Sequence, residues 1–246
     1  MAQMDEFKKE REAIKTAPFK KRLSYFWDYY KWHTLFTIVV IAIICGYVHH
    51  VATAKTSILN GVMLNSFAEG DTAISVAEDF ADKKDIDTSE YDIILNTSFS
   101  YGDSFTYVES RQAITAQSSA GLIDFFTGDT ESMQDVAYSF MLMDLRDILT
   151  EEQVALYEPY FIYIDQSILE AIDAASDNID EPISITYPDW HDPDSMEQPI
   201  PVLIDVSECE HLRTLYDESI SELAFGISTS ISNTEQTLAF LDYLME

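Results

Sequence analysis

The longest apolar stretch of the chain covers residues 32–54. Its 23 residues contain no Asp, Glu, Lys or Arg, and residues 35–44 at its centre are all apolar apart from one Thr. A helix of this length crosses a hydrocarbon core of about 30 Å and satisfies its own backbone hydrogen bonds. The pattern predicts a single transmembrane helix over residues 32–54.

Other interpretations of this stretch stay open. A core helix of a soluble protein is disfavoured because the run is long and its flanks differ strongly in charge. Ala52-Thr53-Ala54 fits a small-residue cleavage site, so a product clipped after Ala54 is an alternative, although the basic region before the apolar run is much longer than in ordinary signal peptides. Lipid attachment at Cys45 is disfavoured because Ile44 precedes it.

Beyond residue 54 the polar pattern alternates between strand and helix periods. Runs that fit buried strands cover residues 57–65, 91–96, 122–126, 160–164, 183–187, 200–206 and 223–227. Stretches with a helical period cover residues 71–81, 106–118, 133–141, 166–175, 208–219 and the end of the chain.

Several local signals place helix starts and strand pairs. Asp71 is expected to cap one helix, and capping boxes begin at Thr150 and Ser232. The strands at 183–187 and 200–206 flank a loop and are expected to pair as antiparallel neighbours. The alternation as a whole predicts an α/β domain with a largely parallel sheet.

The charge is divided sharply by the apolar stretch. Residues 1–31 hold eight basic and five acidic residues, a net charge of +3, whereas the rest of the chain holds six basic and 39 acidic residues, a net charge of −33. By the positive-inside rule, residues 1–31 form a basic cytoplasmic segment and residues 55–246 an acidic extracellular domain. Tyr and Trp side chains between residues 25 and 32 fit an aromatic belt at the inner membrane surface.

The excess of acidic residues and the positions of the two cysteines disfavour several classes of function. A charge of −33 disfavours nucleic-acid binding, which needs clustered Lys and Arg. The simplest interpretation is a solvated acidic coat, and calcium binding is a weaker alternative because no Asp-rich loop has EF-hand spacing. Cys45 lies in the membrane stretch and Cys209 outside it, so no disulfide is expected and the oligomeric state stays open.

Two passages resemble extracellular solute-binding proteins of the type II periplasmic-binding fold. The first is Gly-Leu-Ile-Asp-Phe-Phe-Thr-Gly-Asp at residues 121–129, followed by the helix of Met133 and the Asp-Leu element at 144–149. The second is Phe-Gly-Ile-Ser at 225–228, which precedes a Ser-Asn turn and the last helix. The segment Trp-Asp-Tyr-Tyr-Lys-Trp-His at 27–33 resembles that of small membrane-anchored proteins of Gram-positive anaerobes.

This resemblance implies an extracellular, periplasmic-binding-protein-like (type II) α/β domain behind the transmembrane helix, with the second lobe reduced because the chain is short for a two-lobed member. The function that it implies is non-covalent recognition of a small solute, a sugar or a peptide, for an ABC-type transporter or another membrane protein. The alternative is a domain without a cleft that acts as an accessory subunit of a cell-envelope complex.

The candidate binding residues follow from the predicted strands. Ligands of open α/β sheets bind beyond the carboxyl ends of the strands, at the point where the strand order switches. The side chains expected there come from the strand ends and from the loop at 188–198 with its edge. They are Asn65, Ser66, Asn96, Thr127, Asp129, Tyr187 and Trp190. The alternative is structural: Trp190 packs over the sheet and Asp129 caps the next helix.

Patterns that would indicate an enzyme are sparse. His191 stands among Asp189, Asp192 and Asp194, but no second His or Cys nearby completes a metal-ligand set. Cys209 lies in an acidic run that would raise its pKa, and phosphate-binding glycine patterns are absent. We therefore expect no catalytic residues, no metal and no cofactor.

Overall fold

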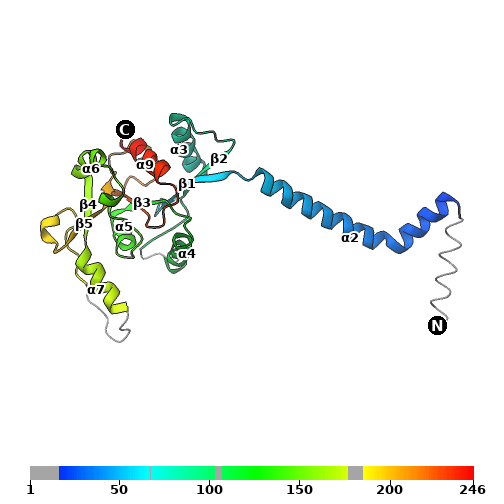
Figure 1. Cartoon of the computed structure of the whole chain (residues 1–246), viewed down its shortest axis with the longest axis horizontal. Helices are drawn as coiled ribbons and strands as arrows, with labels where there is room; N and C mark the ends of the chain where they lie inside the picture. The colour runs from blue at the N-terminus through cyan, green and yellow to red at the C-terminus, as the bar shows by residue number, and fades with distance from the viewer. Residues whose placement is uncertain (1–16, 67, 103–106, 177–184) are drawn as a thin grey trace. The chain divides into compact units, whose positions relative to one another are not determined.

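The structure of the chain is a computed structural model, and the parts that it describes are residues 17–66, 68–102, 107–176 and 185–246. The chain divides into two compact units, Met1–Ala54 and Lys55–Glu246, which are considered separately (Figure 1).

The described part of the first unit is a single helix, α2 (Phe19–Thr53). It follows Pro18, whose fixed φ suits the position before a helix. Its segment Tyr30–Thr53 has a mean hydropathy of 2.2, is not buried, and is long and apolar enough to cross a membrane. The hydroxyl of Thr37 donates to the carbonyl of His33 at 2.8 Å, so this polar group is satisfied within the helix.

The second unit is a mixed α/β domain built on one six-stranded sheet with the order β2-β1-β3-β6-β5-β4 (Figure 1). The strands are β1 (Thr56–Met63), β2 (Tyr91–Asn96), β3 (Phe125–Asp129), β4 (Phe161–Asp165), β5 (Pro199–Asp205) and β6 (Leu223–Ile227). β1 pairs with β2 and β3 in parallel, whereas the pairs β3–β6, β6–β5 and β5–β4 are antiparallel.

The prediction of a largely parallel sheet is therefore right for the first half of the domain and wrong for the second. Residues 183 and 184 lie outside the described chain, and residues 185–187 do not form a strand. β5 pairs instead with β4 and β6. A strand period indicates which faces are buried, but it does not select the neighbouring strand, and here the apolar strands β4 and β6 are the neighbours of β5.

Helices cover both faces of the sheet. They are α3 (Gly70–Lys83), α4 (Tyr107–Ser119), α5 (Thr130–Ala137), α6 (Glu151–Tyr157), α7 (Gln166–Ser176), α8 (Glu210–Arg213) and α9 (Thr234–Met245), with short 3-10 turns at Leu145–Asp147, Glu158–Tyr160 and Pro193–Ser195. Alternate residues of β1 enter the two cores: Leu59 and Met63 pack with α3 and α9, whereas Val62 packs with α4 and α5. This alternation gives three layers, with the sheet in the middle.

Helix α5 is shorter than the predicted 133–141. It ends at Ala137, and Phe140 adopts a left-handed φ of 60° that a continuing helix does not allow. Met141 and Leu142 are buried, and Leu142 forms an isolated β-bridge with Ser228 beyond β6. The chain thus leaves the helix to bury two apolar side chains against the sheet.

The predicted helix starts have mixed outcomes. The capping box of Thr150 with Gln153 is confirmed at the start of α6. The predictions for Asp71 and Ser232 are wrong: α3 begins after Glu69 without a side-chain cap, and α9 is capped by Asn233, which accepts a hydrogen bond from the Gln236 N–H.

The third strand lies three residues later than predicted and begins just after Asp124. Asp124 is fully buried, and one of its oxygens accepts hydrogen bonds from the Ser232 N–H at 2.8 Å and the Ser232 hydroxyl at 2.9 Å. Its other oxygen accepts from the Asn60 N–H at 2.8 Å. This carboxylate joins the start of β3 to β1 and to the turn before α9.

Candidate functional site

The carboxyl ends of β1 and β3 lie side by side at a switch in strand order. β2 and β3 flank β1 on opposite sides, so the two connections β1-α3-β2 and β2-α4-β3 run in opposite directions. In open α/β sheets, such a point leaves a crevice beyond the strand ends. The Leu64 N–H donates to the Thr127 carbonyl at 2.7 Å and fixes the register there.

Asn65 organises the backbone around this point. It follows β1 in a left-handed conformation, with a φ of 55° that Asn tolerates better than most residues. Its Nδ2 donates to Asp129 Oδ2 and to Ser132 Oγ, both at 2.8 Å, and its Oδ1 accepts from the Tyr101 N–H at 2.7 Å. Asp129 also caps α5 by accepting from the Ser132 N–H at 3.0 Å.

Two hollows open beside these residues. The first, the tyrosine hollow, has a volume of about 470 Å³ and is lined by Tyr101, Gly102, Tyr107, Glu131, Ser132, Gln134, Asp135 and Tyr187. The second, the acidic hollow, has a volume of about 820 Å³ and is lined by Asn65, Tyr101, Asp129, Thr130, Glu131, Asp217, Ser219, Ile220, Ser221 and Glu222. Tyr101 and Glu131 line both, and together the two hollows form what we call the strand-end site.

Tyr101 is the unusual residue of this site. Its side chain is only 4% exposed, yet its hydroxyl has no hydrogen-bond partner among the described residues. Burial, with the nearby charge of Asp135, raises the pKa of Tyr101 to about 12, so the hydroxyl stays protonated at neutral pH. Buried hydroxyls without partners are rare in folded proteins because each one loses its hydrogen bonds to water.

The ring of Tyr101 is held in place by its neighbours. It meets the Tyr107 ring edge to face, with 5.3 Å between the ring centroids. The Tyr107 hydroxyl donates to Asp135 Oδ2 at 2.8 Å and accepts from the Arg111 guanidinium at 3.1 Å. Tyr107 is thus satisfied on both sides.

The acidic hollow carries four carboxylates, and no Lys or Arg is among the described residues that line either hollow. Asp217 accepts from the Ser219 N–H at 2.9 Å, and hydrogen bonds from Ser219 hold the pKa of Asp217 below its usual range. Glu222 Oε2 lies 3.6 Å from His191 Nε2. Glu131 occupies the first turn of α5 and is exposed.

The loop that carries Asp217 and Glu222 is shaped by an arginine rather than by a helix. The predicted helix at 208–219 is wrong beyond its first turn, since α8 ends at Arg213. The Arg213 guanidinium donates to the carbonyls of Ser207 and Ser221, each at 2.7 Å, and also to that of Ile220. These bonds satisfy three loop carbonyls and tie Ile220 and Ser221, which line the acidic hollow, to the end of α8.

Among the residues predicted to bind a ligand, three line the strand-end site. Asn65 and Asp129 are hydrogen-bonded to each other in the wall of the acidic hollow. Tyr187 lines the tyrosine hollow, is 44% exposed, and packs on Tyr138 with 4.5 Å between the ring centroids.

The other four lie outside both hollows. Ser66 and Thr127 are buried: the Ser66 hydroxyl donates to the Leu215 carbonyl at 2.6 Å, and the Thr127 hydroxyl lies 2.8 Å from that of Tyr216. Asn96 accepts from the Ser98 N–H at 3.0 Å in a local turn. Trp190 packs against the core on the α4 and α5 side of the sheet.

Sequence reasoning missed the residues that give the site its character: Tyr101, Tyr107, Glu131, Asp135, Asp217 and Glu222. Tyr101 was within reach, because it follows the second strand in the same segment as Asn96. Asp217 was assigned to a helix, and only the Arg213 contacts show why it belongs to a loop.

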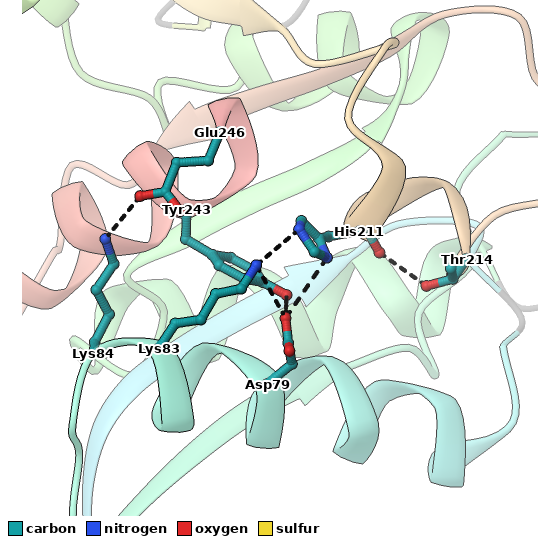
Figure 2. A network of polar contacts seen from close by, with 7 residues as sticks. All are labelled: Asp79, Lys83, Lys84, His211, Thr214, Tyr243 and Glu246. Atoms are coloured by element: carbon teal, nitrogen blue, oxygen red, sulfur yellow. Dashed lines mark hydrogen bonds and ion pairs between the residues drawn. The ribbon is translucent and has the colours of Figure 1, made fainter.

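A second polar cluster lies on α3, α8 and α9. Figure 2 shows Lys83 and His211 directed at Asp79, whose Oδ2 accepts from the Tyr243 hydroxyl at 2.8 Å and lies 3.5 Å from Lys83 Nζ and 3.7 Å from His211 Nδ1. The His211 ring also stacks on that of Tyr243. The hydrogen bond from Tyr243 is the main cause that lowers the pKa of Asp79. We call these four residues the Asp79 cluster.

His191 and Cys209 are the residues for which the sequence raises metal or nucleophile chemistry. Among the described residues, no group of three or more His, Cys, Asp or Glu side chains is placed to hold a metal ion. Cys209 is buried, and this burial raises the pKa of its thiol to about 11, which keeps it protonated at neutral pH.

Comparison of the chain with protein-family models, with curated proteins and with solved structures gave no match.

Proposed function

We propose that the protein is a membrane-anchored receptor whose outer domain binds a small solute non-covalently at the strand-end site. In this proposal residues 32–54, all but the last within α2, cross the bilayer, the basic segment 1–31 stays in the cytoplasm and residues 55–246 lie outside. The net charges of +3 and −33 on the two sides of the apolar stretch support this orientation. The resemblance to type II solute-binding proteins supports the same role, with a membrane transporter as the acceptor of the solute.

The observation that carries the proposal is the buried hydroxyl of Tyr101, a residue that lines both hollows, because this hydroxyl has no partner among the described residues. Its free energy of desolvation is offset only when another polar group reaches it. The volumes of about 470 and 820 Å³ are in the range of small-molecule sites. A solute that enters the strand-end site would supply the missing hydrogen bond.

A screen by thermal unfolding tests this role. The full chain in phosphatidylcholine nanodiscs is heated with sugars, amino acids, short peptides, amines and calcium in turn. A ligand that binds only the folded state stabilises it by about 2.7 kcal/mol at a hundredfold excess over Kd, or about 5–10 °C for a domain of this size. We expect one chemical class to produce this shift and Tyr101→Phe to reduce it. A flat response to the whole panel would contradict the proposal.

The second candidate is an accessory subunit without a ligand. One observation favours it: residues 55–246 form one compact unit around one sheet, whereas solute-binding proteins close two lobes over their ligand. Cross-linking the full chain in its native membrane distinguishes the two. A stoichiometric envelope partner, together with a flat ligand screen, would favour the accessory role.

A further inference from the structure

We infer that the solute taken by the strand-end site is an organic cation that carries a protonated amine. This inference rests on the proposed function and names its ligand class. It depends on two independent observations, the unpartnered Tyr101 hydroxyl and the excess of carboxylates around it.

The hydroxyl defines what the ligand must offer. The Tyr101 oxygen is an unused acceptor, and an ammonium group has up to three N–H donors with no acceptor of its own. Hydrogen bonds from a charged donor are stronger than those between neutral groups. An ammonium group beside Tyr101 can therefore give the buried oxygen a charge-assisted hydrogen bond.

The carboxylates define the sign of the ligand charge. Asp129, Glu131, Asp217 and Glu222 line the acidic hollow, and Glu131 and Asp135 line the tyrosine hollow. Arg111 lies beside Tyr107 and donates to the hydroxyls of Tyr107 and Ser139, but its single positive charge is outnumbered by the five carboxylates that line the two hollows. An anionic ligand would meet like charges on most sides, whereas a cation enters a field that attracts it.

The aromatic rings add a preference that sugars do not explain. Tyr101, Tyr107 and Tyr187 line one hollow, and a cation near the face of a Tyr ring is attracted by the ring quadrupole. Trp190, the large aromatic side chain suited to stacking on a sugar, lies outside both hollows and is partly buried against the core. The described residues also offer no metal-ligand cluster, so a bare cation is a poorer fit than an organic one.

The two hollows suggest how such a ligand lies. Glu131 borders both and begins α5, so a chain with an amine at each end can place one beside Tyr101 and the other among Asp217 and Glu222. Diamines and short peptides with basic side chains have this form.

Titration calorimetry of the full chain in phosphatidylcholine nanodiscs tests the inference. The probes are 1,5-diaminopentane and, as a neutral match of the same length, 1,5-pentanediol. We expect the diamine to bind and the diol to give no heat. Glu131→Gln and Tyr101→Phe should each weaken diamine binding roughly tenfold, because each removes one charged or charge-assisted contact. Glu90→Gln, which removes an exposed acid just before the amino end of β2, away from the carboxyl ends of the strands where the site lies, should leave the affinity unchanged.

The outcomes separate this inference from the proposed function. Equal diamine affinity in wild type, Glu131→Gln and Tyr101→Phe would show binding to the acidic surface in general and would overturn the inference. A neutral or anionic solute that binds in the screen and is weakened by Tyr101→Phe would overturn the amine assignment and leave the receptor role standing. Failure of every probe and of the whole screen would overturn both.

Discussion

The Asp79 cluster and the strand-end site contain the same kinds of side chain in opposite states. In the Asp79 cluster, one carboxylate receives the Tyr243 hydroxyl and lies within 4 Å of a lysine and a histidine (Figure 2). In the strand-end site, several carboxylates gather, and among the described residues none of those lining the site is a Lys or Arg and none is a partner of the Tyr101 hydroxyl. The first cluster is closed by the fold and the second is left open.

This difference separates a role in stability from a role in binding. The contacts of Asp79 join α3, α8 and α9, so they stabilise the folded state. The strand-end site costs stability, since a buried hydroxyl lacks its hydrogen bond and like charges lie near one another. Natural proteins keep such costs where function requires them. Substitutions in the Asp79 cluster should therefore lower the free energy of unfolding, whereas substitutions in the strand-end site should leave it unchanged or raise it.

The largest effect is expected at the most completely satisfied carboxylate, Asp124. Asp124→Ala leaves the N–H groups of Asn60, Ser232 and Asn233 without their acceptor, and we expect the free energy of unfolding to fall by about 3 kcal/mol. Urea unfolding followed by circular dichroism measures it. The control is Glu131→Ala in the strand-end site, which should stay within about 0.5 kcal/mol of wild type. An equal loss of unfolding free energy in both variants would contradict the distinction between carboxylates that the fold satisfies and carboxylates that it leaves without partners.

A matched pair of tyrosine variants sharpens the comparison. Tyr243→Phe removes the hydroxyl that Asp79 accepts and should lower stability, though by less than Asp124→Ala because the Asp79 cluster is partly exposed. Tyr101→Phe removes an unpartnered hydroxyl and should leave stability unchanged or raise it by up to about 1 kcal/mol. Thermal unfolding of both variants decides the point, and a clear loss in Tyr101→Phe would mean that its hydroxyl is already satisfied.

The pH dependence of the Asp79 cluster follows from the lowered pKa of Asp79. A carboxylate whose pKa is lower in the folded state contributes stability above its ordinary value of 3.8 and loses that contribution as pH falls through the folded-state pKa. The difference in stability between wild type and Tyr243→Phe should therefore be full at neutral pH and should shrink below about pH 3.8. Urea midpoints measured from pH 7 down to pH 3 test this. A difference that grows toward acid pH would contradict the assignment.

The smallest effect is expected from charge repulsion in the strand-end site. Glu131→Gln removes one of several neighbouring negative charges and should raise stability by a few tenths of a kcal/mol at low salt, an advantage that added salt screens. Thermal midpoints at low and high ionic strength measure it, with Glu90→Gln as the control. A stabilisation that persists unchanged in high salt would exclude charge repulsion as its cause.

Much of this architecture can be predicted from local sequence patterns, whereas the residues that line the strand-end site mostly cannot. The strand at 91–96 and the one at 223–227 have the predicted bounds, because strand periods and turn residues mark them directly. Asn65 and Asp129 stand at strand ends, where topology alone directs attention.

What local patterns could not give depends on contacts between distant segments. The Tyr101 N–H binds Asn65 across 36 positions, and its hydroxyl is distinctive only once the surrounding structure leaves it unpartnered. Asp217 lies in the loop that lines the acidic hollow, and Arg213 fixes this loop by donating to the carbonyls of Ser207 and Ser221. The antiparallel half of the sheet is likewise a choice among apolar partners, which a period of two does not encode.

Nuclear magnetic resonance of tyrosine rings tests the central claim most directly. The full chain, labelled with ¹³C at the tyrosine ring carbons and held in phosphatidylcholine nanodiscs, is titrated with 1,5-diaminopentane, and Tyr101→Phe and Tyr243→Phe assign the two key signals. The account predicts that the Tyr101 signal moves to saturation while that of Tyr243 stays in place. A shift at Tyr243 without one at Tyr101 would contradict it, because the ligand would then occupy the closed cluster and leave the open site empty.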